Sequence, residues 1–200
     1  MNTPIFSVRD PASPEFWNER FEQAFMPWDK GDVPLALQDY VRRTTPATVL
    51  IPGCGAGYEV AYLAEAGWNV TAIDFSAAAV TCAQTILCKW APCVVQADFF
   101  TFVPRAPLNL IYERAFFCAL PPKMRPQIVQ RWAELLPVGG QVAGFFFFDD
   151  HPKGPPFGIA RPELEQLLHP YFDLIEDQPV SDSIAVFAGK ERWQVWRRKP

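Results

Sequence analysis

The sequence predicts an α/β fold: a doubly wound sheet, mostly parallel, with helices on both of its faces. From residue 47 onward, short apolar runs of strand length alternate with segments of helical periodicity over short connections. Residues 142–148 carry no polar side chain, which is typical of an inner parallel strand buried on both faces. The 200 residues are expected to form one domain, with an N-terminal arm and helical segment over residues 1–45 and the α/β core over residues 46–200.

The composition excludes several classes of protein. The net charge of −4 gives no general attraction to nucleic acid or to an anionic membrane, and no apolar run reaches the length that spans a bilayer. Met1–Asp10 lacks the basic and apolar regions of a signal peptide. The five cysteines form no C-x-x-C pair, so we expect neither a disulfide framework nor a zinc site, and we expect the cytoplasm as the compartment.

The first helix is expected over residues 14–25. Ser13-Pro14 is a favourable start, an N-cap followed by proline at the first helical position. Four bulky side chains lie on this helix: Phe16, Trp17, Phe21 and Phe25. They either pack an added helix onto the core or belong to a lid that closes over a ligand. A loop over residues 26–31 that contains Trp28 follows, and a helix over residues 33–43 leads into the first strand.

The core is expected to contain five strands separated by helices. The strands are predicted over residues 48–52, 69–74, 93–96, 108–112 and 141–148, and the helices over residues 57–66, 76–87 and 121–136. A proline- and glycine-rich loop over residues 149–158 then precedes a short helix over residues 161–168. Two strands, 172–176 and 193–197, are expected to pair antiparallel at the sheet edge, and residues 181–190 between them are either strand or loop.

A glycine-rich turn, Gly53-x-Gly55-x-Gly57, joins the first strand to the first core helix. Glycines leave the backbone amides at the helix start open to a ligand. Asp74 ends the second strand 21 residues after Gly53, where a doubly wound sheet binds a ribose through its hydroxyl groups. Other strand ends carry Asp98-Phe99, Glu113-Arg114 and residues 149–151. The turn and the aspartate together predict a nucleotide-type cofactor.

The spacing of the turn separates two classes of cofactor. Nicotinamide and flavin dinucleotides favour G-x-G-x-x-G with a pyrophosphate at the helix start, whereas the third glycine comes one residue earlier here. Glu59 enters the first helical turn, where a carboxylate is unfavourable beside a pyrophosphate but tolerated beside a zwitterionic amino acid with a sulfonium group. Together with Asp74 and Asp98-Phe99, this pattern favours the second class.

The constellation resembles the class I S-adenosylmethionine-dependent methyltransferases, and further segments narrow the resemblance. Residues 16–21 (FWNERF) and 27–31 (PWDKG) look like the N-terminal cofactor lid of the thiopurine S-methyltransferase family and its plant halide/thiol methyltransferase relatives. Residues 111–120 (IYERAFFCAL) and 151–157 (HPKGPPF) are similar to the same family. The resemblance spans about residues 16–197 and implies a Rossmann-like class I fold with S-adenosyl-L-methionine as the cofactor.

The resemblance also implies a set of cofactor contacts. These are Trp17, Phe21, Trp28, Gly53, Cys54, Gly55, Asp74, Phe75, Asp98, Phe99 and Arg114. The glycine turn would contact the methionine part, Asp74 the ribose, and Asp98 with Phe99 the adenine, while the lid aromatics would cover the cofactor. Phe21 stands where the family has a second lid tryptophan, and Asp74 where the animal thiopurine enzymes have glutamate. Both departures keep the expected chemical role.

Methyl transfer to a thiol needs alignment and exclusion of water rather than an elaborate catalytic group, because thiolates are intrinsically reactive. Arg114 is the predicted catalytic residue, since its charge would favour the thiolate form of the acceptor. The alternative is a structural ion pair of Arg114 with a sheet-end carboxylate such as Glu113 or Asp149. The predicted acceptor contacts are Trp28, Phe116, His151 and Phe157.

Asp149-Asp150 and His151 allow two further interpretations. His151 is either a base or a solvated loop side chain, and a divalent metal is not expected because no third carboxylate accompanies the two aspartates.

The sequence therefore predicts an S-adenosylmethionine-dependent methyltransferase that acts on a small-molecule thiol. A halide or thiocyanate acceptor is the close alternative, because residues 116–119 look more like the plant halide enzymes. A dinucleotide-dependent oxidoreductase and a catalytically silent cofactor-binding protein are competing interpretations from different functional classes. We expect a monomer, and apolar acceptor contacts tolerate many small thiols, so the physiological acceptor stays open.

Overall fold

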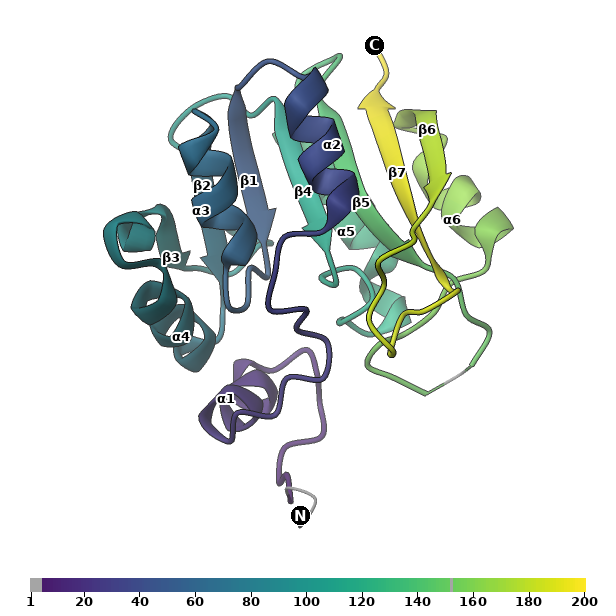
Figure 1. The fold of residues 1–200 in the computed structure, drawn as a ribbon. Coiled ribbons are helices and arrows are strands. Elements are labelled where there is room, and N and C mark those ends of the chain that lie inside the picture. Colours follow the sequence, from purple (N-terminus) through teal and green to yellow (C-terminus); the bar gives the residue numbers. More distant parts are fainter. Residues whose placement is uncertain (1–4, 152) are drawn as a thin grey trace.

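The computed structural model describes residues 5–151 and 153–200. Over this part of the chain, seven strands form one sheet in the order β3-β2-β1-β4-β5-β7-β6 (Figure 1). The first four residues of the predicted N-terminal arm and Pro152 of the 151–157 segment lie outside the described residues. The predicted α/β fold, a mostly parallel doubly wound sheet with one antiparallel strand near the C-terminus, is confirmed.

The helices and strands lie close to their predicted positions. The strands are β1 Thr48–Pro52, β2 Asn69–Asp74, β3 Val94–Gln96, β4 Leu110–Arg114, β5 Gln141–Phe147, β6 Phe172–Pro179 and β7 Glu191–Arg198. The α-helices are α1 Pro14–Glu22, α2 Leu35–Arg43, α3 Tyr58–Glu65, α4 Ala77–Leu87, α5 Arg125–Leu135 and α6 Arg161–Leu168, and short 3₁₀ helices cover Cys88–Cys93 and Pro122–Met124. None of the helices in the described ranges has the length and apolar character needed to cross a membrane.

Several boundaries differ from the prediction by two to four residues. The helix predicted over residues 14–25 ends at Glu22, because Ala24 has φ 50° and leaves the helical conformation, so Phe25 is not on it.

Two other differences also have identifiable reasons. β4 begins two residues late because Asn109 is bonded to the start of β1, where its amide donates to the Thr48 carbonyl and its side-chain oxygen accepts from the Thr48 amide. The predicted helix over residues 121–136 is divided, with α5 beginning at Arg125. Pro126 then falls in the first turn, the one part of an α-helix where proline costs no hydrogen bond.

The last two strands pair antiparallel at the edge of the sheet as predicted, with β6 outermost and β7 between β6 and β5. β7 pairs antiparallel with both β5 and β6. Trp193 and Trp196 of β7 are almost fully buried, and they belong to the hydrophobic clusters on opposite faces of the sheet. A strand that buries large side chains on both faces needs neighbours on both sides, which explains its interior position. Residues 181–190, left open from the sequence, form turns.

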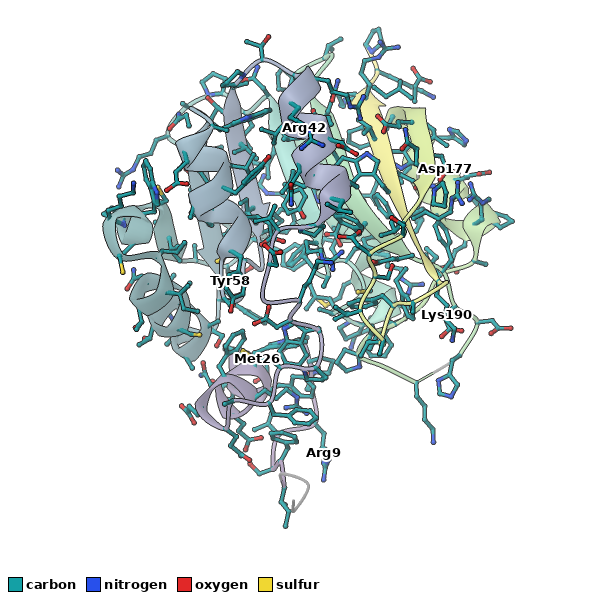
Figure 2. The ribbon with its side chains drawn as sticks, in the orientation of Figure 1. Arg9, Met26, Arg42, Tyr58, Asp177 and Lys190 are labelled. Atoms are coloured by element: carbon teal, nitrogen blue, oxygen red, sulfur yellow. The ribbon has the colours of Figure 1, made fainter. Side chains whose placement is uncertain are left out.

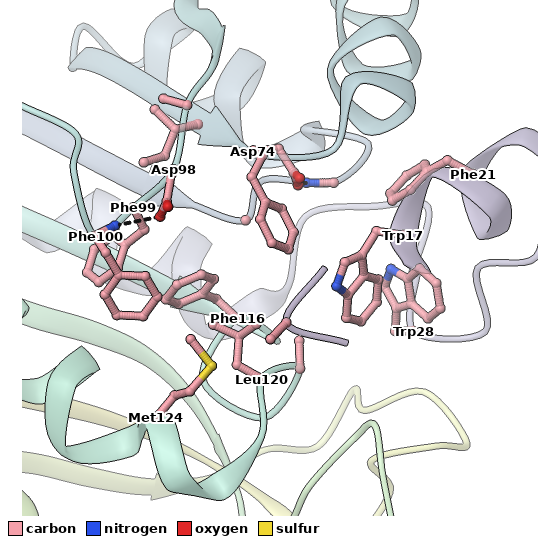
Figure 3. A pocket seen from close by; sticks show the side chains of 17 residues that line it. Trp17, Phe21, Trp28, Asp74, Asp98, Phe99, Phe100, Phe116, Leu120 and Met124 are labelled. Carbon is pink, nitrogen blue, oxygen red and sulfur yellow. Dashed lines mark hydrogen bonds between the residues drawn. The ribbon is translucent and has the colours of Figure 1, made fainter. Parts of the chain in front are cut away.

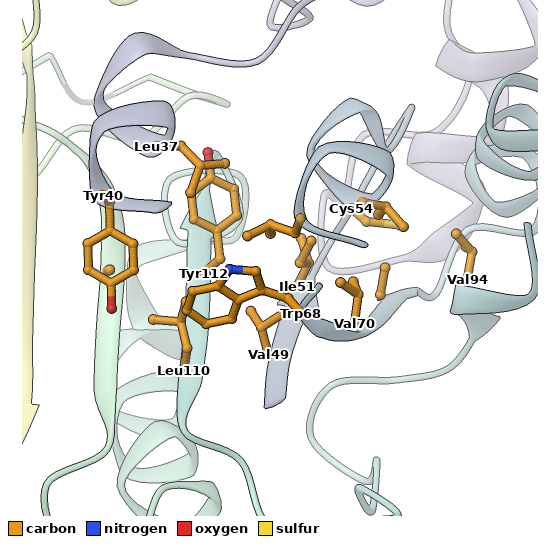
Figure 4. Packing of buried hydrophobic residues seen from close by; sticks show 14 of the residues in the cluster. Leu37, Tyr40, Val49, Ile51, Cys54, Trp68, Val70, Val94, Leu110 and Tyr112 are labelled. Carbon is orange, nitrogen blue, oxygen red and sulfur yellow. The ribbon is translucent and has the colours of Figure 1, made fainter. Parts of the chain in front are cut away.

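Helices cover both faces of the sheet (Figure 1). Val49 and Ile51 of β1 pack with residues of α2, α3 and α4, whereas Leu50 between them packs with residues of α5 and α6. Figure 4 shows the first of these clusters, in which Leu37 of α2 lies near Tyr112 of β4. Tyr40 of α2 lies over β5 and donates from its hydroxyl to Gln141 at 2.8 Å. This alternation follows from the period of two along a strand, and it leaves the carboxyl ends of the parallel strands free to form a site.

Gly144 of β5 is a point of very close approach between strands. It lies opposite Glu113 of β4, and a Cβ atom at Gly144 would stand 1.9 Å from the Glu113 carbonyl oxygen. That oxygen is backbone of an inner strand and cannot rotate away. Glycine at this position therefore fixes the distance between β4 and β5.

We predict that Gly144→Ala lowers the free energy of unfolding by more than about 3 kcal/mol, because the clash forces two inner strands apart. Gly139→Ala is the matched control: Gly139 has φ +85° but nothing within 4 Å of an added Cβ. The left-handed backbone alone should cost about 1–2 kcal/mol there. Urea denaturation followed by circular dichroism measures both, and an equal loss in the two variants would contradict the packing argument.

Candidate active site

The carboxyl ends of β1, β2 and β4 meet the segment that contains α1 at an elongated cavity (Figure 3). The glycine turn after β1 and Asp74 of β2 lie along its middle. Asp98 and a group of phenylalanine side chains lie at one end, and Trp17 and Trp28 lie across from them. The cavity is therefore built from segments that are distant in the sequence and that the sheet brings to one edge.

The glycine turn adopts a backbone that other residues rarely take. Gly53, Gly55 and Gly57 have φ of 58°, 52° and 78°, in the left-handed region that glycine enters without steric cost. A Cβ at Gly53 would stand 2.7 Å from the ring of Phe116. Cys54 is buried in the turn and its amide donates to the Ile73 carbonyl at 3.1 Å, which ties the turn to β2. The turn thus presents bare backbone to the cavity.

Asp74 is a buried carboxylate at the middle of the cavity. Its Oδ2 accepts from the Gly55 amide at 3.2 Å and its Oδ1 accepts from the Ser76 amide at 2.9 Å. Burial raises the pKa of Asp74 to about 6, against the lowering effect of these backbone hydrogen bonds. Each carboxylate oxygen retains lone pairs that a pair of ligand hydroxyl groups could use.

One end of the cavity is apolar and closed by aromatic rings. The ring centroid of Phe99 lies 5.0 Å from that of Phe116 and 5.4 Å from that of Phe100. Asp98 is exposed beside them, and its Oδ1 accepts from the Phe100 amide at 2.8 Å. Leu120 also lines this end. A flat ring with a polar edge would find both an apolar slot and a carboxylate here.

The predicted lid aromatics line the opposite wall. Trp17 and Phe21 come from α1, and their ring centroids lie 5.4 Å and 6.1 Å from that of Trp28 in the following loop. Trp17 donates from Nε1 to the Pro11 carbonyl at 2.8 Å. Figure 3 shows the three rings on one side of the cavity, so the structure brings these residues to one place as the sequence resemblance implied.

A second, smaller cavity adjoins the first and shares Trp28 and Gly55 with it. Arg114 lies in it with Glu59 of the helix after the glycine turn. Glu59 accepts from the Tyr112 hydroxyl at 3.3 Å, and burial raises the pKa of Glu59. The smaller cavity therefore combines an acidic and a basic side chain next to the glycine turn.

Arg114 forms an ion pair with a sheet-end carboxylate, as the structural alternative expected, but the partner is Glu191 rather than Glu113 or Asp149. Its Nη1 lies 3.4 Å from Oε2 of Glu191 on β7, whereas Asp149 pairs with Lys190 and Glu113 accepts from the Phe117 amide. Within the described part of the chain, Arg114 Nη2 is buried without a hydrogen-bond partner. A buried guanidinium nitrogen without a partner is costly, and Nη2 is free to donate to an acceptor that enters the smaller cavity.

Two predicted acceptor contacts lie outside both cavities. His151 is exposed, and its Nδ1 accepts from the Lys153 amide at 3.2 Å. Phe157 is partly buried, and its amide donates to the Cys118 carbonyl at 2.7 Å. Their roles stay predictions. Across residues 5–151 and 153–200, His, Cys, Asp and Glu side chains form no group of three or more that could hold a metal ion.

Several lining residues were not singled out from the sequence. They are Ala12, Asp29, Tyr58, Ile73, Ala97, Phe100, Ala119, Leu120 and Met124. Leu120 and Met124 stand within or just after the segment that carried the family resemblance, which is a usable signal. Glu191 gives no local signal, because its contact with Arg114 depends on β7 entering the sheet beside β5.

The fold is that of the class I S-adenosylmethionine-dependent methyltransferases. It is similar to the crystal structure of the 1,6-didemethyltoxoflavin-N1-methyltransferase of Burkholderia thailandensis, with a TM-score of 0.72 and 19% identity over 100% of this chain and 94% of that one. At this identity the likeness shows the fold alone.

Residues 12–199 match the family described as Thiopurine S-methyltransferase (TPMT), and the chain belongs to this family of S-adenosylmethionine-dependent methyltransferases. It is 31% identical to thiocyanate methyltransferase 1 of Brassica oleracea over 191 residues, covering 91% of this chain and 84% of that protein. It is 28% identical to the thiopurine S-methyltransferase of Vibrio atlanticus over 194 residues, covering 85% and 88%. The predicted family is confirmed, and a dinucleotide-dependent oxidoreductase is not supported.

We predict that the affinity for S-adenosylhomocysteine, the demethylated cofactor, falls about tenfold per pH unit below pH 6. The ionised Asp74 carboxylate would accept hydrogen bonds from the ribose, and its pKa of about 6 sets the pH below which that form is lost. Asp74→Asn should weaken binding about 100-fold and remove most of this pH dependence. Isothermal titration calorimetry between pH 5 and 8 gives both results, and Asp98→Asn is the control that weakens binding but keeps the pH dependence.

Proposed function

We propose that this protein transfers the methyl group of S-adenosylmethionine to a small-molecule thiol. The observation that carries the proposal is the buried, half-paired guanidinium of Arg114 beside the glycine turn, where the sulfonium end of the donor would lie. Membership of the thiopurine S-methyltransferase family supports the same reaction.

The chain's residues fit the donor along its length. Asp98 and Phe99 would hold the adenine, and Asp74 would accept hydrogen bonds from both ribose hydroxyl groups. The bare backbone at Gly53 and Gly55 leaves room for the amino-acid part, since a Cβ at Gly53 would strike Phe116. The unpartnered Arg114 Nη2 would meet either the donor's carboxylate or the acceptor.

When bound, S-adenosylmethionine supplies an electrophilic methyl group on a sulfonium, so the protein needs to align the reactants and exclude water. We propose that residues 14–31 act as the lid that does this. Trp17, Phe21 and Trp28 wall the cavity from that segment. Trp28 also packs against a small cluster of Cys118, Phe147 and Phe187 next to Arg114. Aromatic walls around the reacting atoms keep water from competing with the thiol.

Arg114 would increase the reactivity of the acceptor by its charge. Its guanidinium lies 4.3 Å from the ring centroid of Phe145, and its side chain is 11% exposed. A cation in such surroundings is poorly solvated and favours the ionised form of a nearby thiol. A thiolate attacks the methyl carbon directly, so no general base is required.

Thiocyanate or halide ions are the second candidate acceptors. The specific observation is the aromatic surroundings of Arg114, whose guanidinium faces the rings of Phe145 and Phe187 at 4.3 and 5.8 Å. Large, weakly hydrated anions lose little solvation in such a pocket. The Brassica relative, named a thiocyanate methyltransferase, supports this alternative. A panel of hydrosulfide, thiocyanate, iodide and an aromatic thiol as competing acceptors would rank the candidates.

A monomer in the cytoplasm completes the proposal. All five cysteines are free thiols in the structure, which agrees with a reducing compartment. Size-exclusion chromatography with light scattering tests the monomer.

We predict that Arg114→Gln lowers kcat/KM for the thiol about 100-fold at pH 7. The pH at which the rate rises should move up toward the solution pKa of the thiol, because the cation no longer favours the thiolate. If Arg114 instead holds the donor's carboxylate, the Kd for S-adenosylhomocysteine rises and the pH profile stays in place. Rates measured between pH 6 and 10 with calorimetry separate the two roles.

Arg114→Lys is the matched variant, because it keeps the charge but not the two-pronged geometry, and its rate should lie between those of the wild type and Arg114→Gln. Since Glu191 loses its cationic partner in Arg114→Gln and, among the described residues, keeps only the Ser183 hydroxyl, thermal unfolding must show that the variant is folded at the assay temperature. A folded Arg114→Gln enzyme with unchanged rate, pH profile and donor affinity would refute a role for this side chain.

A further inference from the structure

Asn18 joins α1 to the core. Its Oδ1 accepts from the Ser76 hydroxyl at 2.7 Å and from the Ala78 amide at 3.2 Å, both at the start of α4. Within the described residues, these are the side-chain hydrogen bonds that connect α1 with the α/β core, and the two helices pack side by side (Figure 1). The first amides of a helix have no partner inside it, so α4 offers donors that an outside acceptor can use.

Ser76 links this contact to the ribose carboxylate. Its side chain is fully buried, and its Oγ accepts from the Ala79 amide at 3.1 Å as the N-cap of α4. Its backbone amide donates to Asp74 Oδ1 at 2.9 Å. One residue therefore bonds to Asn18 through its hydroxyl and to Asp74 through its amide. A displacement of α1 relative to α4 would act directly beside the cavity.

The segment formed by α1 and the arm before it is held together by its own hydrogen bonds. The Trp17 indole donates to the Pro11 carbonyl, and the Glu19 carboxylate accepts from the amides of Ser7 and Val8. These bonds join the arm before α1 to the helix itself, so the two move together. One anchor to the core is then enough to set the position of the whole unit, including the Trp17 side chain beside Asn18 in the chain.

We propose that Asn18 is a positioning residue for the methyl donor: through Ser76 it fixes α1, and with it Trp17 and Phe21, in register with the carboxylate that binds the ribose. The proposal rests on the proposed function, because it takes the cavity to be the donor site. Trp17 and Phe21 line the same cavity as Asp74 (Figure 3). Binding of the donor and docking of α1 are coupled. A bound donor should therefore protect the amides of α1 from hydrogen exchange, and a loosely docked α1 should lower the affinity for the donor.

Asn18→Ala tests the proposal, with Gln23→Ala as the matched control at the exposed end of the same helix. Hydrogen exchange of residues 14–22 without ligand should be at least about tenfold faster in Asn18→Ala than in the wild type, because both accepted hydrogen bonds are lost. The Kd for S-adenosylhomocysteine should rise about tenfold, while the thermal midpoint of the unliganded core stays unchanged. Gln23→Ala should match the wild type in each measurement.

Two further variants separate this contact from a general effect on α1. Asn18→Asp keeps an oxygen that can accept from the same two donors, and a negative charge is favourable at the start of α4, so slow exchange of residues 14–22 should be retained. Ser76→Ala removes the other partner. If the two residues act through one contact, the double variant Asn18→Ala/Ser76→Ala should bind S-adenosylhomocysteine no more than about twofold worse than the weaker single variant.

Wild-type exchange and wild-type affinity in Asn18→Ala would overturn the proposal, as would an equal loss of affinity in Gln23→Ala. If the wild-type protein binds no S-adenosylhomocysteine, the proposed function fails and the donor-positioning role fails with it. The exchange rates without ligand would still show whether Asn18 docks α1, so the two failures are distinguishable.

Discussion

The site depends on one buried carboxylate. Asp74 joins the turn after β1, the end of β2 and the start of α4, since it accepts from the amides of Gly55 and Ser76. These bonds offset only part of the cost of burial, and the pKa therefore stays raised to about 6. Because this lies above the pKa in an unfolded chain, ionisation of Asp74 reduces the stability of the unliganded fold as the pH rises through 6. A ligand that donates two hydroxyl groups would recover that cost, as is common at functional sites.

The position of Arg114 depends on a different constraint, the close approach of β4 and β5. Gly144 lets the Glu113 backbone lie against β5, and the Glu113 side chain turns back to accept from the Phe117 amide at 3.1 Å. Burial raises the pKa of Glu113 to about 8. The backbone of this residue spaces the strands, and its side chain shapes the turn after β4. Arg114 is the last residue of β4 and pairs with Glu191 of β7. The position of this charge beside the glycine turn is thus set by packing between strands.

The sequence was sufficient for features that depend on local chemistry. The helix start at Ser13-Pro14 and the span of β2 follow from residue type and periodicity, and the structure has both as predicted. The sequence did not predict which strands that are distant along the chain pair with each other. Nothing in the pattern around Glu191 indicates that β7 enters between β5 and β6, so both the sheet order and the partner of Arg114 required the tertiary structure. The exposed position of His151 depends likewise on how its loop closes.

The strand order also constrains how the protein is made. β6 pairs with β7 alone, while β7 pairs with β5 on its other side. During synthesis β6 leaves the ribosome first and has no place in the sheet until β7 follows it. Before β7 is made, a parallel sheet could extend only as far as β5, whose outer edge would stay open and where Arg114 would lack the Glu191 carboxylate. The last strand in the sequence is therefore the one that completes both the sheet beside β5 and the ion pair of Arg114.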